Sequence, residues 1–335
     1  MNILVVRLGA LGDVVHTIPA VAALRRAYPD ARIDWLVEAK HRDLVDLVTV
    51  IDGVVAIEGP TLAAWRAAVN ELRGTRYDVA IDFQGLMKSA VLARASGAPR
   101  VIGFSIWHLR EKTARPFYSA TAEGEGGHVV VKNLRLLRAL DIDDERIEFP
   151  IAHTGVSAEA ILERDVTGPY ALINPGAAWP NKRWPPERFG ELAAFLADAR
   201  GLTPIVLWGP AEEPLARAVV DASSGRAVLA PPTRVRDLVA LARGASLVVS
   251  GDTGPLHVAT AVGTPTVSIF GPTNPERNGP WNADDVAVSR FDECGCHYDR
   301  RCHRDTWCLL DVKATEVCAA AQRRLALPER PDGSR

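Results

Sequence analysis

The sequence has few cysteines and no long hydrophobic run. All five cysteines lie between Cys294 and Cys318, which excludes a disulfide framework for the rest of the chain; we expect these five to be reduced thiols or metal ligands. No apolar run approaches the ~18 residues that span a bilayer. No charged leader precedes the strand-like start Met1–Val6, so we expect no secretory signal. These absences predict a cytosolic protein, or one attached to the inner face of a membrane.

The chain also lacks a strong net charge. Its formal charge of −2 excludes a general attraction for nucleic acid or for an anionic membrane. Between residues 88 and 138, however, nine Lys and Arg stand against three Glu, a net charge of +6. This stretch is where we expect an anionic partner, with a solvated basic face as the alternative.

What the chain does have is the length and hydrophobic rhythm of two α/β domains. It has 335 residues, 47% of them hydrophobic, and short apolar runs alternate with amphipathic segments, a pattern typical of parallel sheets covered by helices. The predicted strands are Ile3–Val6, Ile33–Val37, Val54–Ile57, Val79–Asp82 and Arg100–Gly103, then Tyr170–Asn174, Pro204–Trp208, Ala227–Leu229, Leu247–Ser250 and Thr266–Phe270. The predicted helices are Asp13–Ala27, Leu62–Leu72, Lys88–Ala95 and His128–Leu140, then Pro186–Ala199, Glu213–Ala222, Arg234–Arg243 and Pro255–Val262.

The two halves predict two Rossmann-like domains, over residues 1–155 and 165–312, followed by a C-terminal helix over 313–327. The acidic, less regular stretch Asp141–Thr167 marks the seam between them. Ligands of such sheets bind at the carboxyl ends of the strands. Two sheets facing each other would put one ligand on each domain and the chemistry in the cleft.

The loop after the first strand, residues 7–13, is rich in glycine and opens a helix. Its spacing is not the full dinucleotide fingerprint, so it does not favour NAD. Asp13 has two interpretations, which do not exclude each other. It can cap the helix by accepting backbone N–H bonds, or it can take a proton from a hydroxyl group.

Three loops of the second half carry polar groups just after predicted strands. Lys182 lies in the first loop and can reach a phosphate as a point charge. Glu212 and Glu213 follow the second strand and can accept hydrogen bonds from ribose hydroxyls. The third loop, 250–257, places Gly254, Pro255 and His257 at a helix start, which favours an anion site. Solvated charges or packing are the alternatives for these side chains.

The cysteines have the spacing Cys294-x-Cys296-x5-Cys302-x5-Cys308, with His297 and His303 among them. Paired zinc knuckles usually have two to four residues between ligands, which this spacing only approximates. Two interpretations stay open: a bound Zn or Fe, or a reduced cysteine-rich loop. Asp141-Ile142-Asp143, the one Asp-x-Asp, lies in the seam and is interpreted as a solvated linker.

Taken together, these motifs resemble a known family. The opening 3–20, Asp82–Ser89, the loop Asn174–Trp184, and Gly251–His257 with Phe270–Thr273 are similar, in order and over nearly the whole chain, to glycosyltransferase family 9, the heptosyltransferases of lipopolysaccharide. The block Gln84–Ser89 is most similar to the heptosyltransferase I group.

The resemblance implies a GT-B fold in which the N-terminal domain binds the acceptor and the C-terminal domain binds the nucleotide sugar. It implies ADP-L-glycero-β-D-manno-heptose as donor, an anionic, lipid-linked Kdo sugar as acceptor at the inner-membrane surface, and transfer with inversion. Asp13 would be the general base. The implied donor residues are Lys182, Glu213 (with Glu212 one step away), Asp252, Thr253, Gly254 and His257. The acceptor candidates are Gln84, Lys88, Arg110, Lys112 and Arg115.

On this interpretation no cofactor or metal is required, because Lys182, His257 and a helix N-terminus would neutralise the phosphates. Heptosyltransferase II, or a relative that acts on another surface glycan, is the alternative within the family. Outside it, the alternatives are a nucleotide-binding module without transferase activity and a nucleotide-sugar epimerase of similar architecture.

Overall fold

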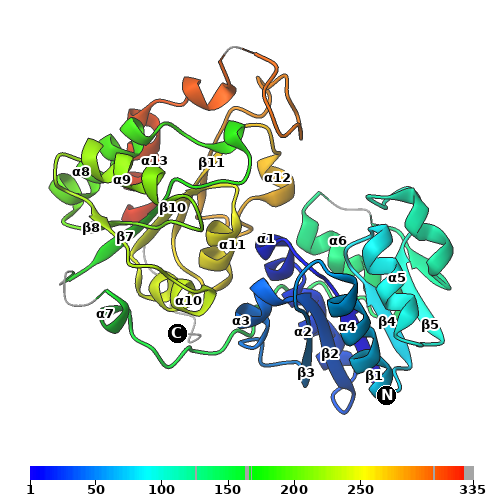
Figure 1. Cartoon of the computed structure of the whole chain (residues 1–335). Coiled ribbons are helices and arrows are strands. Elements are labelled where there is room, and N and C mark those ends of the chain that lie inside the picture. Colours follow the sequence, from blue (N-terminus) through cyan, green and yellow to red (C-terminus); the bar gives the residue numbers. More distant parts are fainter. Residues whose placement is uncertain (125–126, 163–165, 167, 305, 328–335) are drawn as a thin grey trace. The chain divides into compact units, whose positions relative to one another are not determined.

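The computed structural model describes residues 1–124, 127–162, 166, 168–304 and 306–327. The chain divides into two compact units, Met1–Ala152 and His153–Arg335. Each unit has its own six-stranded sheet, and every pair of neighbouring strands is parallel. The ribbon in Figure 1 shows helices packed beside the strands of each unit. The predicted α/β class with two parallel sheets is confirmed.

The first sheet has the strand order β3-β2-β1-β4-β5-β6. Its strands are β1 (Asn2–Val6), β2 (Arg32–Glu38), β3 (Gly53–Ile57), β4 (Val79–Asp82), β5 (Arg100–Phe104) and β6 (Ala120–Ala122). The central strands are buried on both faces, which accounts for their continuous apolar runs. The order reverses between β1 and β4, so the crevice where such sheets bind ligands lies beyond these two strands.

The helices of the first unit largely follow the predicted segments. They are α1 (Leu11–Val15), α2 (Ile18–Ala27), α3 (Arg42–Val45), α4 (Leu62–Gly74), α5 (Met87–Ala95) and α6 (Val129–Leu136), with 3-10 turns η1 (Ala39–His41), η2 (Lys112–Phe117) and η3 (Leu137–Leu140). The predicted single helix Asp13–Ala27 was wrong, because α1 ends and α2 begins around Thr17. Pro19 lacks an N–H group and fits only the first turn of a helix, where α2 places it.

The second sheet has the order β12-β11-β10-β7-β8-β9, which is the order of the first sheet read from the other edge. Its strands are β7 (Tyr170–Asn174), β8 (Thr203–Val206), β9 (Val228–Leu229), β10 (Leu247–Gly251), β11 (Thr266–Phe270) and β12 (Val286–Ser289). Here the order reverses between β7 and β10. The crevice therefore lies where the sequence places Asn174 and the 250–257 loop.

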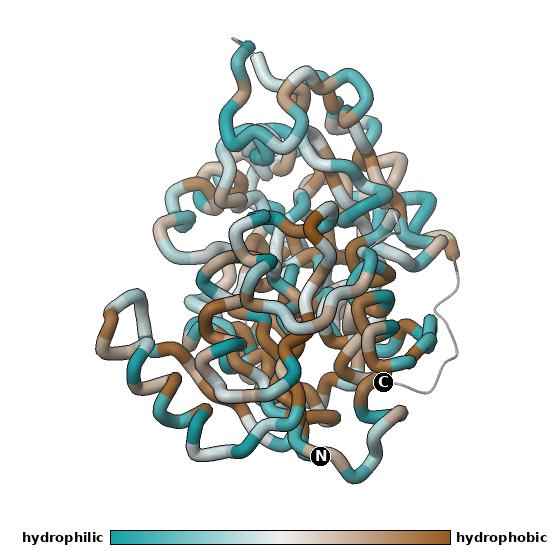
Figure 2. The backbone as a smooth tube through the Cα atoms, turned by 90° about the vertical axis from the view of Figure 1, so that its right-hand side faces the viewer, coloured by the Kyte–Doolittle hydropathy of each residue, from teal (hydrophilic) through white to brown (hydrophobic). Residues whose placement is uncertain are grey.

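The helices of the second unit cover both faces of its sheet. They are α7 (Ala158–Ile161), α8 (Pro186–Arg200), α9 (Glu213–Ala222), α10 (Val235–Gly244), α11 (Gly254–Ala261), α12 (Pro275–Asn278) and α13 (Ala314–Ala326), with η4 (Pro180–Lys182) and η5 (Cys308–Asp311). The core between α8, α13 and the sheet contains Trp184, Phe189 and Val317. Brown, hydrophobic stretches alternate with teal, hydrophilic ones along the backbone in Figure 2.

Within the part of the chain that the structure describes, none of these helices is both long enough and apolar enough to cross a membrane.

Candidate functional site

In the first unit, the loops after β1 and β4 are bound to each other beyond the strand ends. The Leu8 amide donates to Gln84 Oε1 at 2.8 Å. Arg7 donates through Nη1 to the carbonyl oxygen of Phe83, and its Nη2 lies 2.8 Å from Asp13 Oδ1. Gln84 is thereby buried, and its amide oxygen holds the first loop in place. The order of strands brings Gln84 and Asp13, which are far apart in the sequence, to one crevice.

The surroundings of Asp13 fit both interpretations made from the sequence, a helix cap and an acceptor of a proton. It lies in the first turn of α1 and accepts from the Ala10 amide at 3.4 Å, a long hydrogen bond. The pairing with Arg7 is closer, and 30% of the Asp13 side chain is still exposed. Arg7 therefore fixes the carboxylate while leaving part of it exposed.

His41, which the sequence patterns did not predict as a site residue, lies beside the same loop. His41 is buried, and its ring lies so close to Gly9 that a Cβ there would be 2.8 Å from Nε2. Burial and the charge of Lys40 lower the pKa of His41 to about 4, while Glu38 and Asp13 act in the opposite direction. The imidazole beside the Asp13 loop is thus neutral near pH 7. No motif marks His41; only the glycine beside it hints at a close approach.

The cationic acceptor candidates have different surroundings. Lys88 Nζ pairs with Glu38 Oε1 at 2.9 Å, and Lys40 Nζ pairs with the other oxygen at 2.8 Å. Arg110 and Lys112 are exposed, and Lys112 Nζ lies 5.9 Å from the ring centre of Trp107. Arg115 is half-buried and donates to the Tyr118 carbonyl at 3.1 Å. Arg110 and Lys112 are therefore the most accessible cations of this set.

In the second unit, Asp252 is the centre of a compact polar cluster at the end of β10. Its side chain is 6% exposed. Lys182 Nζ lies 2.6 Å from Oδ2, and His257 Nε2 lies 3.1 Å from Oδ1. Burial by itself would raise the pKa of Asp252, but the bond with His257 and the charge of Lys182 hold it well below its ordinary value. Asp252 is therefore an ionised, buried carboxylate that orients two donors.

Asp252 has two further donors that were not among the donor-binding residues named from the sequence. Thr273 Oγ1 donates to Oδ2 at 2.8 Å, and Asn278 Nδ2 lies 3.5 Å from the same oxygen. Thr273 follows β11, the neighbour of β10. The available signal for Thr273 was the Phe270–Thr273 motif of the family resemblance, which contains the end of β11 and the loop after it.

The N-terminus of α11 lies beside this cluster. Thr253 precedes the helix, Gly254 begins it, and Pro255 occupies its first turn. The Thr253 hydroxyl is 2.9 Å from Ser250 Oγ and accepts from Asn174 Nδ2 at 3.1 Å. These side chains fix the loop, and a helix N-terminus such as that of α11 favours a bound anion.

The two glutamates after β8, Glu212 and Glu213, lie in different surroundings. Glu213 Oε1 pairs with Arg217 at 2.5 Å, both on the exposed face of α9. Glu212 Oε2 accepts from the Gly209 amide at 3.1 Å, and a Cβ at Gly176 would be 2.1 Å from the same oxygen. Glu212 is thus the glutamate that lies against the strand-end loop of β7.

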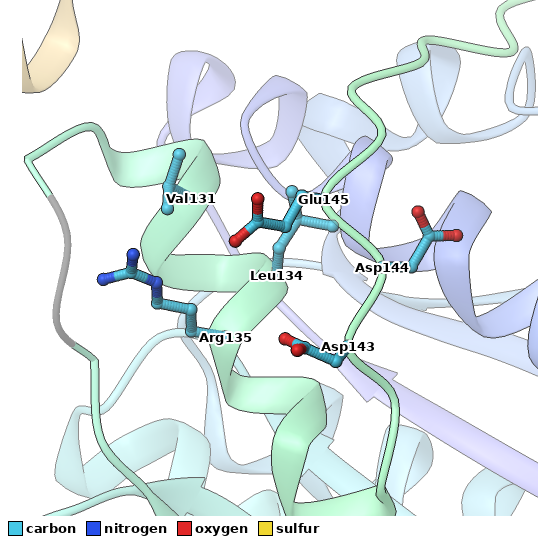
Figure 3. A pocket seen from close by; sticks show the side chains of 6 residues that line it. All are labelled: Val131, Leu134, Arg135, Asp143, Asp144 and Glu145. Atoms are coloured by element: carbon cyan, nitrogen blue, oxygen red, sulfur yellow. The ribbon is translucent and has the colours of Figure 1, made fainter.

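A pocket of about 190 Å³ lies in the first unit, away from these residues. It is lined by Val131, Leu134, Arg135, Asp143, Asp144 and Glu145, between α6 and the following acidic segment (Figure 3). Asp143 pairs with Arg138, and Asp144 pairs with Arg26. None of the predicted site residues lines this pocket. The predicted residues that contact one another lie at the strand ends, which are therefore the candidate site.

Comparison with known proteins identifies the family. Residues 65–308 match the family model of glycosyltransferase family 9 (heptosyltransferase). Lipopolysaccharide heptosyltransferase 1 of Pseudomonas aeruginosa is 30% identical over 316 residues, which cover 90% of this chain and 87% of that relative. The chain belongs to glycosyltransferase family 9. It is therefore a glycosyltransferase, and the resemblance inferred from its motifs is confirmed.

Solved structures of the family agree in fold. E. coli heptosyltransferase WaaC with ADP has a TM-score of 0.79 at 24% identity, covering 97% of this chain and all (100%) of that one. E. coli WaaC with ADP-2-deoxy-2-fluoro heptose has a TM-score of 0.72 at 26% identity, covering 86% and 93%. This family 9 chain has the GT-B fold, as predicted. Its family-model match contains Lys182, Asp252 and His257 but begins after Asp13.

Proposed function

We propose that this family 9 enzyme transfers L-glycero-D-manno-heptose from ADP-heptose to the Kdo sugar of the lipopolysaccharide inner core, with inversion, as a heptosyltransferase I. The observation that carries the proposal is the buried Asp252, which holds Lys182 and His257 beside the N-terminus of α11. Two cationic or polar donors and a helix N-terminus are the groups that a departing diphosphate needs. A relative whose name specifies heptosyltransferase 1 supports the choice of sugar.

On the donor side, Thr253, Gly254 and His257 would hold the diphosphate, with Lys182 at a phosphate or the ribose and Asp252 at the heptose. Family resemblance gives Glu213 as the ribose carboxylate. The geometry favours Glu212 instead, because Glu213 is engaged with Arg217 on the helix surface whereas Glu212 lies against Gly176. The donor is supported by the relative whose structure contains an ADP-heptose analogue.

On the acceptor side, Asp13 would act as general base. It takes the proton of the acceptor hydroxyl while that oxygen bonds to the anomeric carbon and the bond to the ADP oxygen breaks on the opposite face. Arg7 orients Asp13 for this step. Gln84, Lys88, Arg110, Lys112 and Arg115 are the proposed acceptor contacts, since guanidinium and ammonium groups suit Kdo carboxylates and lipid phosphates. We propose that the reaction needs no cofactor or metal and takes place at the cytoplasmic face of the inner membrane.

The test is a transfer assay that separates binding from turnover. In Asp13→Asn, ADP release with Kdo-bearing lipid A should fall by roughly 100-fold or more, the usual loss with a general base, while calorimetric affinity for ADP-heptose stays within twofold. The matched control Asp30→Asn changes an exposed aspartate of the same unit and should keep full activity. Unchanged turnover in Asp13→Asn would show that Asp13 serves only as a helix cap.

The alternatives predict different products. A nucleotide-binding module would release no ADP with any acceptor. An epimerase would change the donor sugar in the absence of acceptor. A heptosyltransferase II would use an acceptor that already carries the first heptose, and would leave Kdo-bearing lipid A unmodified.

A further inference from the structure

Four of the five cysteines converge in the irregular segment between β12 and η5. Cys294, Cys296 and Cys308 are buried and pack against one another, and Cys302 packs against them. Cys296 Sγ lies 3.2 Å from Cys302 Sγ, and Cys308 is hydrogen-bonded to Cys294. Residues 290–304 and 306–307, which the structure describes here, form no helix or strand. We call Cys294, Cys296, Cys302 and Cys308 the thiol cluster.

The surroundings of the thiol cluster suit negatively charged sulfur. The Cys296 amide donates to Cys294 Sγ at 3.4 Å, and the His303 amide donates to Cys296 Sγ at 3.3 Å. The Arg304 guanidinium lies over the loop, with Nη2 3.8 Å from the position of a Cβ at Gly295. Hydrogen bonds to sulfur and a nearby cation are the second-shell features that stabilise metal-bound thiolates.

Four cysteine sulfurs in contact with one another are the ligand set of a structural zinc site. Cysteine binds a metal as the thiolate, and a divalent cation is the partner that would stabilise four neighbouring thiolates together.

We propose that the thiol cluster binds one tetrahedral divalent metal ion of the zinc type through all four sulfurs. Binding releases four protons and leaves a site of net charge −2, beside Arg304. The ion is structural, since four protein ligands leave no open position for a substrate.

The thiol cluster must expand slightly to accept the ion. Among the described residues, no three His, Cys, Asp or Glu side chains already have the spacing of a metal site. A tetrahedron with metal–sulfur bonds of ~2.3 Å has edges of about 3.8 Å, so Cys296 and Cys302 would separate by about half an ångström. A segment without helix or sheet hydrogen bonds can make this adjustment.

The segment that holds the thiol cluster also supports the proposed donor site. A Cβ at Gly271 would lie 2.9 Å from Cys308 Sγ, and the Tyr298 amide donates to the Pro272 carbonyl at 2.8 Å; Thr273 follows these two residues. Asn181 Nδ2 donates to the Asp299 carbonyl at 2.9 Å, next to Lys182. The bound metal would therefore hold two loops that contact Asp252.

The first experiment measures metal in the full chain, purified in the presence of a thiol reductant and without a metal-affinity tag. We expect one zinc-type ion per chain in the wild type and in Cys318→Ser, which changes the one cysteine outside the thiol cluster. In Cys302→Ser, whose thiol is the most exposed of the four, the content should fall at least several-fold. Cobalt substitution of the wild type should give the absorption spectrum of a tetrahedral tetrathiolate.

The second readout is calorimetric affinity for ADP, which should weaken several-fold when a chelator removes the metal and recover when zinc returns. Four free thiols with no metal in the wild type would overturn the proposal. So would intact mass showing a Cys296–Cys302 disulfide, or equal metal content in Cys302→Ser. Metal content does not depend on heptosyl transfer, so this proposal and the proposed function can fail separately.

Discussion

At the scale of single residues, Asp252 shows how one buried charge organises a site. It accepts from Lys182, His257 and Thr273, which come from three separate stretches of the chain. Because its partners hold the carboxylate ionised despite burial, removing its charge leaves Lys182 without its partner in a largely buried place.

We predict that Asp252→Asn lowers the free energy of unfolding by roughly 3–5 kcal/mol, the usual effect of breaking a buried ion pair, and raises the KM for the donor. Urea unfolding and donor-dependent kinetics measure the two effects. Asp198→Asn is the control: Asp198 is 58% exposed in its pair with Arg226, so little should change. Equal unfolding curves for the two variants would contradict this account of Asp252.

The same substitution has a definite pH dependence. Since the folded pKa of Asp252 is lowered, its stabilisation is present above the unfolded value of about 3.9 and is lost as the pH falls through the folded value. The stability difference between wild type and Asp252→Asn should therefore be full at neutral pH and shrink in acid. A stability difference that grows below pH 4 would contradict the lowered pKa of Asp252.

His41 gives an independent pH prediction in the first unit. Its pKa in the folded chain is about 4, against about 6.5 when unfolded, so the unfolded state binds the extra proton. Stability should rise with pH between these values, by up to about 3 kcal/mol for this one group. His41→Gln should flatten that rise, measured by urea unfolding across pH 4–7, and the exposed His153→Gln should leave the rise unchanged.

Part of the site could be predicted at this scale. Lys182 and His257 were candidates because polar residues just after buried strands mark the ligand edge of a parallel sheet, whereas Asp252 was implied by the family resemblance. Their bonds to one another could not be predicted, because local patterns do not say which strands are neighbours. His41 and Asn278 belong to no motif, and Arg7 belongs to the opening motif but was given no role of its own; the roles of all three follow only from tertiary contacts.

At the scale of elements, close helix packing depends on one glycine. Gly190 of α8 lies against α9, and a Cβ there would be 2.5 Å from Ala222 Cβ and 2.6 Å from the Ala222 carbonyl carbon. Both contacts involve atoms that cannot rotate away, so the helices would have to move apart.

We therefore predict that Gly190→Ala destabilises the second unit by about 1–3 kcal/mol through overpacking. Gly74→Ala is the control at the end of α4, where a Cβ would meet nothing within 4 Å. That substitution should be neutral or stabilising by up to about 1 kcal/mol. Thermal unfolding checks both, and the account fails if Gly190→Ala is as stable as the wild type.

Long elements were predicted more reliably than short ones. Helices α4, α8 and α9 agree with their predicted segments within a few residues, because their apolar periodicity extends over several turns. The edge strands β6 and β12 were missed, since they are short and only partly buried and so lack the fully buried apolar run of the central strands. The break between α1 and α2 was missed because Pro19 was read as part of a continuing helix.

At the scale of the whole molecule, the repeated strand order explains why two halves without an evident sequence repeat have the same kind of ligand edge. In each unit the order reverses beside the strand that begins the unit, β1 or β7. Asp13 follows the first of these strands, and Asn174 ends the second. The proposed division of labour, acceptor chemistry in the first unit and donor binding in the second, rests on these two edges.

The most direct test of that proposal is the structure of the product. The enzyme should be incubated with ADP-L-glycero-β-D-manno-heptose and Kdo-bearing lipid A, and the product examined by mass spectrometry and NMR. We predict a gain of one heptose residue on the acceptor, stoichiometric ADP, and an α linkage, as inversion of a β donor requires. An unmodified acceptor, or a β-linked heptose, would contradict the account.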